Sequence, residues 1–249
     1  MMNCKLLKTF TPITLEDMSG VKLMNRTDTK FVTRTDRLHR LLQMAKDDYY
    51  IQEIDGERNL EYDTTYFDTC GYDMYYQHQW NHAYRQKIRF RTYCISGLQF
   101  MEVKTKNNHG RTNKKRMEVA DMDVSEQTKT AFLRKHLRYG ADTLRPTLNN
   151  HFSRITLVNK ARTERLTIDN ALRFHNLVSH ERRDMGNLVV IELKRDGRAS
   201  SPILEMLRKL HIHPHGFSKY SMGSALTNPE LRVNRFKRDL IEINKIITA

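Results

Sequence analysis

The chain has 249 residues, with 43 Lys plus Arg against 29 Asp plus Glu and a formal net charge of +14. This length allows one large domain with a buried core, and no Pro- or Gly-rich linker divides residues 1–249, so we expect a single domain. The positive excess predicts an anionic partner, such as nucleic acid, a phospholipid surface or a phosphate chain. No run approaches the roughly 18 apolar residues of a membrane span, which predicts a cytoplasmic protein without an anchor.

Several common site types are not indicated by the sequence. The cysteines Cys4, Cys70 and Cys94 are odd in number and lack metal-binding spacing. They therefore suggest neither a disulfide framework nor a structural zinc site. A P-loop motif, GxxxxGK[ST], is also absent, so nucleotide binding, if present, does not use the N-terminus of a P-loop helix.

The first half of the chain is dominated by strand patterns. A loop and short helix at residues 10–24 precede a strand at 27–33. A helix at 35–47 follows, in which Leu38, Leu41, Leu42 and Ala45 recur at helical spacing behind Thr35 as the expected cap. Strands are predicted at 62–69, 84–93 and 98–106 and after a turn at 107–110, and a helix is predicted at about 125–138.

The second half repeats this scheme. Strands are predicted near residues 151–158, 164–169 and 188–195, followed by a helix at about 201–210 and a basic helical tail at about 229–247. So many strands, spread over the whole chain, favour an antiparallel barrel flanked by helices. Tyr and Phe cluster at 62–76, for which core packing is a commoner explanation than base stacking.

Charged side chains share one face on five of the predicted strands. Residues two apart on a strand point to the same side of a sheet. The charged residues that alternate with apolar neighbours in this way are Lys87, Arg89 and Arg91; Glu102, Lys104 and Lys106; Arg154; Arg165 and Asp169; and Glu192 and Lys194. Each strand therefore has one apolar face and one charged face.

For a single strand, a charged face exposed to water is the ordinary explanation. Arg recurs on these faces, however, and its planar guanidinium suits bidentate contact with phosphate. Glu and Lys also recur two residues apart, as in Glu102 with Lys104 and Glu192 with Lys194, as a metal ligand beside a phosphate ligand would require. We therefore expect an α+β fold whose barrel encloses a cationic tunnel.

An ordered series of segments points to a family. The segments are NRTDTKFV (25–32), YDTTYFDT (62–69), RQKIRFRTY (85–93), FMEVKTKNNHGRTNKKR (100–116), RLTID (165–169), VIELK (190–194) and GFSKYSMG (216–223). Together they resemble the successive motifs of the VTC domain, the inorganic polyphosphate polymerase family of the triphosphate tunnel metalloenzyme (CYTH-like) superfamily. They occur in the family's order and cover about residues 20–225.

One segment departs from the wider superfamily, whose first strand reads Glu-x-Glu-x-Lys. The corresponding run here is Arg26-Thr27-Asp28-Thr29-Lys30, which keeps only the last acid and the lysine in kind. This resembles the VTC branch more than the triphosphatase or cyclase branches, and it counts against a two-carboxylate metal site on that strand.

The resemblance implies an eight-stranded antiparallel β-barrel that encloses a tunnel. The tunnel binds a nucleoside triphosphate and inorganic polyphosphate together with a divalent metal ion, either Mn²⁺ or Mg²⁺. The implied catalytic residues are Lys30, Arg89, Arg91, Arg154, Arg165 and Glu192. The implied phosphate- or nucleotide-binding residues are Lys104, Lys106, Lys114, Arg116, Lys194, Ser218 and Lys219. Glu192 is the implied metal ligand, and Glu102 is a weaker metal candidate.

The expected reaction is transfer of the γ-phosphate, most readily that of ATP, to a growing polyphosphate chain. Because the terminal phosphate of that chain is already ionised, it needs no dedicated general base. Attack by water would make the same site a triphosphatase, with Asp28 or Glu102 as the base. A non-catalytic polyanion-binding module is the third alternative, and a membrane protein partner that receives the product is left open.

The basic run RTNKKR at residues 111–116 has two explanations of its own. Short basic runs can form nucleic-acid or localisation patches. Because this run follows a predicted turn and begins a return strand, we favour a tunnel wall and expect no specific nucleic-acid partner.

Overall fold

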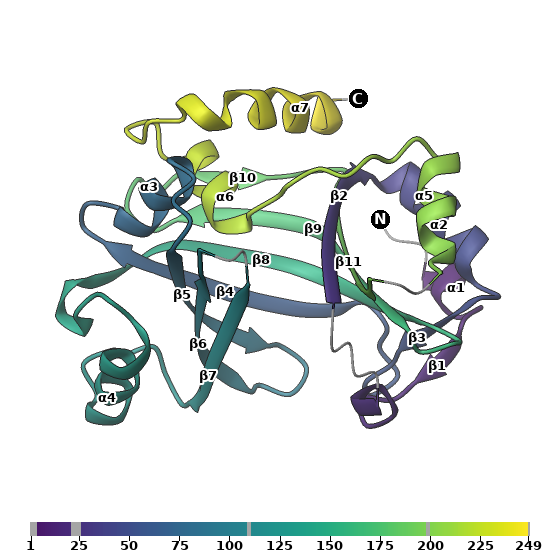
Figure 1. Cartoon of the computed structure of the whole chain (residues 1–249), viewed down its shortest axis with the longest axis horizontal. Helices are drawn as coiled ribbons and strands as arrows, with labels where there is room; N and C mark the ends of the chain where they lie inside the picture. Colours follow the sequence, from purple (N-terminus) through teal and green to yellow (C-terminus); the bar gives the residue numbers. More distant parts are fainter. Residues whose placement is uncertain (1–3, 21–25, 109–110, 198–199, 249) are drawn as a thin grey trace.

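The computed structural model describes residues 4–20, 26–108, 111–197 and 200–248 (Figure 1). Eight strands pair in the order β2-β11-β9-β8-β4-β5-β6-β7, with every neighbouring pair antiparallel. Their bounds are β2 Arg26–Arg34, β4 Leu60–Thr69, β5 Arg85–Tyr93, β6 Gln99–Lys106, β7 Thr112–Val119, β8 Leu144–Asn159, β9 Glu164–Asn176 and β11 Leu188–Asp196. The short strands β1 (Thr11–Ile13), β3 (Tyr49–Gln52) and β10 (Arg182–Asp184) extend this sheet.

The fold class is confirmed, although the word barrel is too strict. The pairing path ends at β2 and β7, and within the described residues these two strands do not pair with each other. The sheet is therefore open along one edge, and its curved charged face forms a trough and not a sealed tunnel (Figure 1).

Helices flank the sheet as expected. They are α1 Cys4–Leu7, α2 Thr35–Ala45, α3 Asp73–Gln79, α4 Gln127–His136, α5 Pro202–Lys209, α6 Lys219–Thr227 and α7 Lys237–Thr248, with short 3₁₀ segments at Asp17–Gly20, Ala141–Thr143 and Asn234–Phe236. None of the helices in the described ranges is long and apolar enough to cross a membrane.

Most predicted elements lie where the sequence indicated them, with differences at their ends. The strands expected at 151–158 and 164–169 are the middle parts of longer strands, because β8 begins at Leu144 and β9 continues to Asn176. Thr35 is the first residue of α2, not its cap, and its hydroxyl donates to the carbonyl of Asn187 at 3.3 Å. The expected loop at 10–24 and turn at 107–110 fall partly on residues 21–24 and 109–110, which lie outside the described residues.

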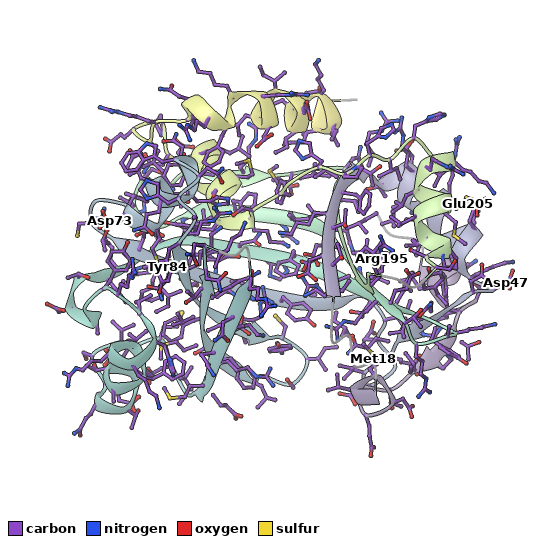
Figure 2. All side chains as sticks on the ribbon, viewed as in Figure 1. Met18, Asp47, Asp73, Tyr84, Arg195 and Glu205 are labelled. Carbon is purple, nitrogen blue, oxygen red and sulfur yellow. The ribbon has the colours of Figure 1, made fainter. Side chains whose placement is uncertain are left out.

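Apolar side chains pack the outer face of the sheet against helices on two sides. Leu38, Leu41 and Leu42 of α2 are fully buried in one cluster with residues of α5, β8, β9 and β11. On the other side, Leu133 of α4 packs in a cluster with residues of β5 and β6. Figure 1 shows α2 and α5 together at the right and α4 at the lower left. In Figure 2, Glu205 of α5 and Asp47 after α2 lie at the outer margin, away from the sheet.

Helices α6 and α7 close one end of the opposite, concave face (Figure 1), where α6 covers β8, β9 and β10 and α7 lies against β2 and β11. Gly223 allows α6 to lie directly on the strands, because a Cβ at this position would come within 2.6 Å of Phe174 and 2.7 Å of Leu148. The buried carboxylate of Asp68 links the same end: it accepts from the backbone N–H groups of Met74 and Tyr75, both at 3.0 Å, and from the Tyr220 hydroxyl at 2.5 Å. These contacts fix the position at which α6 begins.

Candidate functional site

The strand register brings the predicted charged residues together on the concave face of the sheet. Glu192 of β11 lies directly opposite Lys30 of β2. Arg154 of β8 lies opposite Asp169 of β9, and Arg89 of β5 lies opposite Glu102 of β6. Charges that are up to about 160 residues apart in the chain thus share one surface.

Two aromatic rings form a floor beneath the cations at the centre of this face. Tyr62 of β4 and Phe152 of β8 stack with ring centroids 5.4 Å apart and an interplanar angle of 7°. The guanidinium carbons of Arg91 and Arg154 lie 5.6 and 5.3 Å from both ring centroids, and the Lys219 amine lies 4.4 Å from that of Phe152. Cations at such distances are attracted to the faces of the rings. We call Arg91, Arg154 and Lys219 the cation cluster.

Asp169 is the counter-ion of this cluster, and it was not predicted as a site residue. Its oxygens accept bonds from Arg154 at 2.6 and 2.9 Å, and the Lys219 amine also contacts it. Burial opposes ionisation, but the charges of Arg154 and Lys219 outweigh it and hold the Asp169 pKa well below its usual range. Arg91 instead donates to the Thr64 hydroxyl at 3.2 Å. Three cations therefore face one carboxylate, which leaves an excess of positive charge.

Glu102 occupies a similar counter-ion position nearer β7. One of its oxygens lies 2.6 Å from Arg89, and the other lies 2.9 Å from Lys114. Burial would raise the Glu102 pKa, but the neighbouring charges, chiefly that of Arg89, lower it to about 2. Because both oxygens contact cations, this geometry favours a counter-ion role over the metal-binding role suggested by the sequence.

Replacing Glu102 tests this interpretation. Glu102→Gln releases Arg89 and Lys114, so we expect the affinity for tripolyphosphate to rise by about fivefold, which corresponds to about 1 kcal/mol. The Mn²⁺ concentration that gives half-maximal activity should not change. Titrations of both ligands measure these quantities, and a strongly raised metal requirement would instead identify Glu102 as a metal ligand.

Glu192 lies among lysines beside the cation cluster. Its carboxylate is 3.1 Å from the amine of Lys194, and Lys30 faces it across the strand pair. Although burial raises the pKa of Glu192, the charges of Lys194, Lys30 and Lys104 lower it to about 2. Lys30 itself donates to the carbonyl of Phe217 at 2.7 Å, which ties β2 to the segment before α6.

The first turn of α6 supplies the predicted Ser218 and Lys219. Ser218 is the N-cap residue, and its hydroxyl accepts from the backbone N–H of Ser221 at 3.2 Å. The same hydroxyl accepts from the Lys87 amine at 2.7 Å. Lys87 was recognised as part of the charged face but was not assigned to the site. The alternation of β5, which puts Lys87 on the face of Arg89 and Arg91, was the signal that could have identified it.

The remaining predicted residues lie on the same face but farther from the cluster. Lys104 lies opposite Lys87 on β5 and Lys114 on β7, and Lys106 lies opposite Arg85. Arg165 lies opposite Lys194, and the Arg116 guanidinium is 4.8 Å from the Phe100 ring centroid. The RTNKKR run is therefore divided: Lys114 and Arg116 line the concave face, while Lys115 alternates onto the outer face.

The carboxylates of this face fit a divalent metal ion that is shared with the phosphates of a substrate. In the part of the chain that the structure describes, no three His, Cys, Asp or Glu side chains gather into a metal-binding group. Mg²⁺ commonly binds through one or two carboxylates together with substrate phosphates. Glu192 can act as the protein ligand of such a shared ion, because Asp169 and Glu102 are engaged by cations on both oxygens. A metal held by protein ligands alone does not fit.

The family model of the VTC domain matches residues 25–228. The chain belongs to the VTC domain family. This confirms the resemblance that the sequence motifs indicated, and the matched segment extends from before Lys30 on β2 to beyond Lys219 on α6. It therefore contains the whole cation cluster together with Asp169, Glu102 and Glu192. No curated protein sequence matches this VTC domain significantly.

Solved structures share the fold of this VTC domain at low sequence identity. A candidate adenylate cyclase from Bacillus halodurans is 14% identical, with a TM-score of 0.50, and the match covers 86% of this chain and 100% of that one. A candidate adenylyl cyclase from Hippeastrum, described as having a dominant triphosphatase activity, is 13% identical with a TM-score of 0.46 and coverage of 83% and 98%. At 14% identity, the Bacillus halodurans structure supports the fold alone.

The lysine in the cation cluster of the VTC domain gives anion binding a defined pH dependence. Burial lowers the pKa of Lys219 to about 8, although Asp169 opposes the shift. Lys219 is therefore charged below pH 8 and loses its charge as the pH rises above it. We expect the contribution of Lys219 to the affinity for tripolyphosphate to fall as the pH rises through 8, by up to about tenfold per pH unit for this group. Calorimetric titrations measure this, and Lys219→Arg should flatten the profile.

Proposed function

We propose that this VTC domain is a metal-dependent polyphosphate polymerase that transfers the γ-phosphate of a nucleoside triphosphate, ATP in the first instance, to a growing inorganic polyphosphate chain. The observation that carries the proposal is the cation cluster. Arg91, Arg154 and Lys219 are held over an aromatic floor and face one carboxylate, so the face has a positive excess that a phosphate chain would neutralise. Family membership and the tunnel fold both support an activity on triphosphates.

The proposed roles follow from what phosphoryl transfer requires. The reaction needs alignment of the attacking and leaving oxygens and neutralisation of charge on the transferred group, with little covalent chemistry from the protein. Arg154 and Arg91 bind the γ-phosphate, and Lys219 and Lys30 bind the adjacent phosphates. A metal held by Glu192 would neutralise charge on the phosphate oxygens. Because the strands already hold these hydrogen-bond donors in place, no free energy is spent on reorienting them when the reaction occurs.

The state of Glu102 favours a phosphate nucleophile over water. A water molecule needs a general base whose pKa lies near the working pH. The pKa of Glu102, one of the two bases suggested by the sequence, is about 2, and both of its oxygens are engaged. Such a carboxylate is a weak base. The terminal phosphate of a chain is ionised already, so the site suits polymerisation better than hydrolysis.

Product analysis tests the proposal. The purified protein is incubated with ATP and Mn²⁺, and products are resolved by gel electrophoresis beside a Glu192→Gln control. Phosphate chains that lengthen with time and are lost in the control are the expected result. Release of free phosphate alone would identify a triphosphatase. Tight polyphosphate binding without turnover would identify a binding module.

A further inference from the structure

A second polar cluster lies at the α3 and α6 end of the charged face, around Lys87 of β5. The Lys87 amine is 2.7 Å from the Ser218 hydroxyl and 3.0 Å from Nδ1 of His78 on α3. The same His78 nitrogen is 2.6 Å from the Ser221 hydroxyl. The Lys87 amine also lies 5.9 Å from the ring centroid of Tyr220. Side chains from α3 and from α6 with its N-cap residue thus converge on one amine of β5.

Lys87 differs from three other lysines of this face in its partners. Lys114, Lys194 and Lys219 each form an ion pair with a carboxylate. Within the described residues, the hydrogen-bonding partners of Lys87 are the neutral Ser218 and His78. Neither of these two partners supplies a counter-charge that would keep the amine protonated.

The charges that surround Lys87 have its own sign. Lys104 of β6 lies directly opposite it, and Lys30 of β2 binds the carbonyl of Phe217, the residue before Ser218. The groups that face Lys87 include Lys30 from β2, Arg85 and Arg89 from β5, Lys104 from β6 and His78 from α3. Burial and then these cations place the Lys87 pKa well below its ordinary value. Burial, and then the charges of Lys87, Arg85, Lys30 and Lys106, lower the His78 pKa to about 2, so its imidazole is neutral.

The donor count of the amine shows where an anion would bind. A protonated lysine has three N–H donors. Ser218 accepts one of them, and His78 accepts a second in the tautomer whose Nδ1 carries no proton; the third has no acceptor among the hydrogen bonds of the described residues. A phosphate oxygen on the concave face would accept this donor and would supply the missing negative charge.

We propose that Lys87 binds a phosphate oxygen of the chain in the trough and takes up one proton from solvent when it does so. The proton converts the neutral amine to an ammonium, and no other bond is made or broken. This inference rests on the proposed function for its ligand, and it adds that phosphate binding is coupled to protonation at a residue outside the cation cluster.

Calorimetric titration with tripolyphosphate in buffers of different ionisation enthalpy measures the protons taken up, at several pH values from 6 to 9. The proteins compared are wild type, Lys87→Met, Lys87→Arg and Lys115→Met. The last is a matched loss of charge on the outer face of β7. Lys219, Lys104 and the ligand's own phosphates are present in all four proteins, so a difference from wild type that both Lys87 variants share reports Lys87. Thermal melts confirm that each variant is folded.

The expected result is that both Lys87 variants take up fewer protons than wild type, by up to about one per site, while Lys115→Met matches wild type. Lys87→Arg should still bind, because its permanent charge replaces the protonated amine. Equal proton uptake in all four proteins, or loss of binding in Lys87→Arg, would overturn the inference while leaving the proposed function intact. Failure of the wild type to bind tripolyphosphate would overturn both.

Discussion

Arg154→Gln is expected to lower the rate of phosphoryl transfer by about 10²–10³-fold. Arg154 contacts both the aromatic floor and Asp169 through its planar guanidinium, which is therefore held in one orientation before the substrate arrives. A glutamine retains hydrogen-bonding capacity but not the charge that stabilises the transferring phosphoryl group. Steady-state kcat/KM for ATP in the presence of a polyphosphate primer measures the loss.

A matched control separates this local effect from a change in net charge. Arg182→Gln removes one positive charge from β10, where the side chain is exposed and lies opposite His175 of β9, which is not a predicted site residue. It should retain wild-type activity. The variant Arg154→Gln should stay folded, because Lys219 still neutralises Asp169. Wild-type activity in Arg154→Gln would contradict the role assigned to the cation cluster.

Asp169→Asn is expected to lower the free energy of unfolding by about 3–5 kcal/mol in the absence of ligand. The substitution leaves Arg91, Arg154 and Lys219 close together and partly buried without a counter-charge. Because a bound phosphate chain supplies that charge, tripolyphosphate should restore most of the lost stability and should bind more tightly than to wild type. Denaturant titrations with and without tripolyphosphate measure both effects.

Asp47→Asn provides the control for this prediction. Asp47 is exposed beyond the end of α2 and lies at the outer margin of the molecule (Figure 2). Its replacement removes the same charge without touching the site, and we expect a change within ±0.5 kcal/mol. An Asp169→Asn variant as stable as wild type without ligand would show that the three cations do not need a counter-ion, contrary to the excess charge on which the proposed function depends.

The charged face could be predicted because strand alternation is a local property. Lys87, Arg89 and Arg91 alternate with Ile88 and Phe90, and the structure buries the apolar pair against α4 while the cations line the concave face. The same reasoning located Arg154, Glu192 and Lys194. Asp169 shares this alternation, yet its role depends on Lys219, which is 50 residues away and comes from a helix. No local pattern joins those two residues.

Two helices near the site could not be predicted for a related reason. Helix α6 buries Tyr220, Ser221, Met222, Gly223 and Ser224 in succession, so it lacks the apolar stripe at 3.6-residue spacing by which surface helices are recognised. Helix α3 is a short aromatic run, DMYYQHQ, whose composition is also typical of strands. Both helices are positioned by Asp68, a tertiary contact and not a periodic signal.

The strands predicted at 151–158 and 164–169 are shorter than β8 and β9. In β8 the reason is the presence of turn-forming residues. Pro146, Asn149 and Asn150 favour turns, yet they lie within β8. Pro146 is accommodated because the pairing of β8 with β4 shifts register between Tyr66 and Phe67, where the ladder has no regular hydrogen bond to lose. The longer strands carry Phe152 and Arg154 toward the centre of the face.

The measurement that tests the central claim most directly follows the γ-phosphate itself. The protein is incubated with Mn²⁺, a polyphosphate primer and ATP labelled at the γ-phosphorus, and the label is then separated into chain, free phosphate and nucleotide. The account predicts that the label enters the chain in proportion to the ADP formed, and that Arg154→Gln abolishes this transfer. Label recovered only as free phosphate, with the primer unextended, would contradict it.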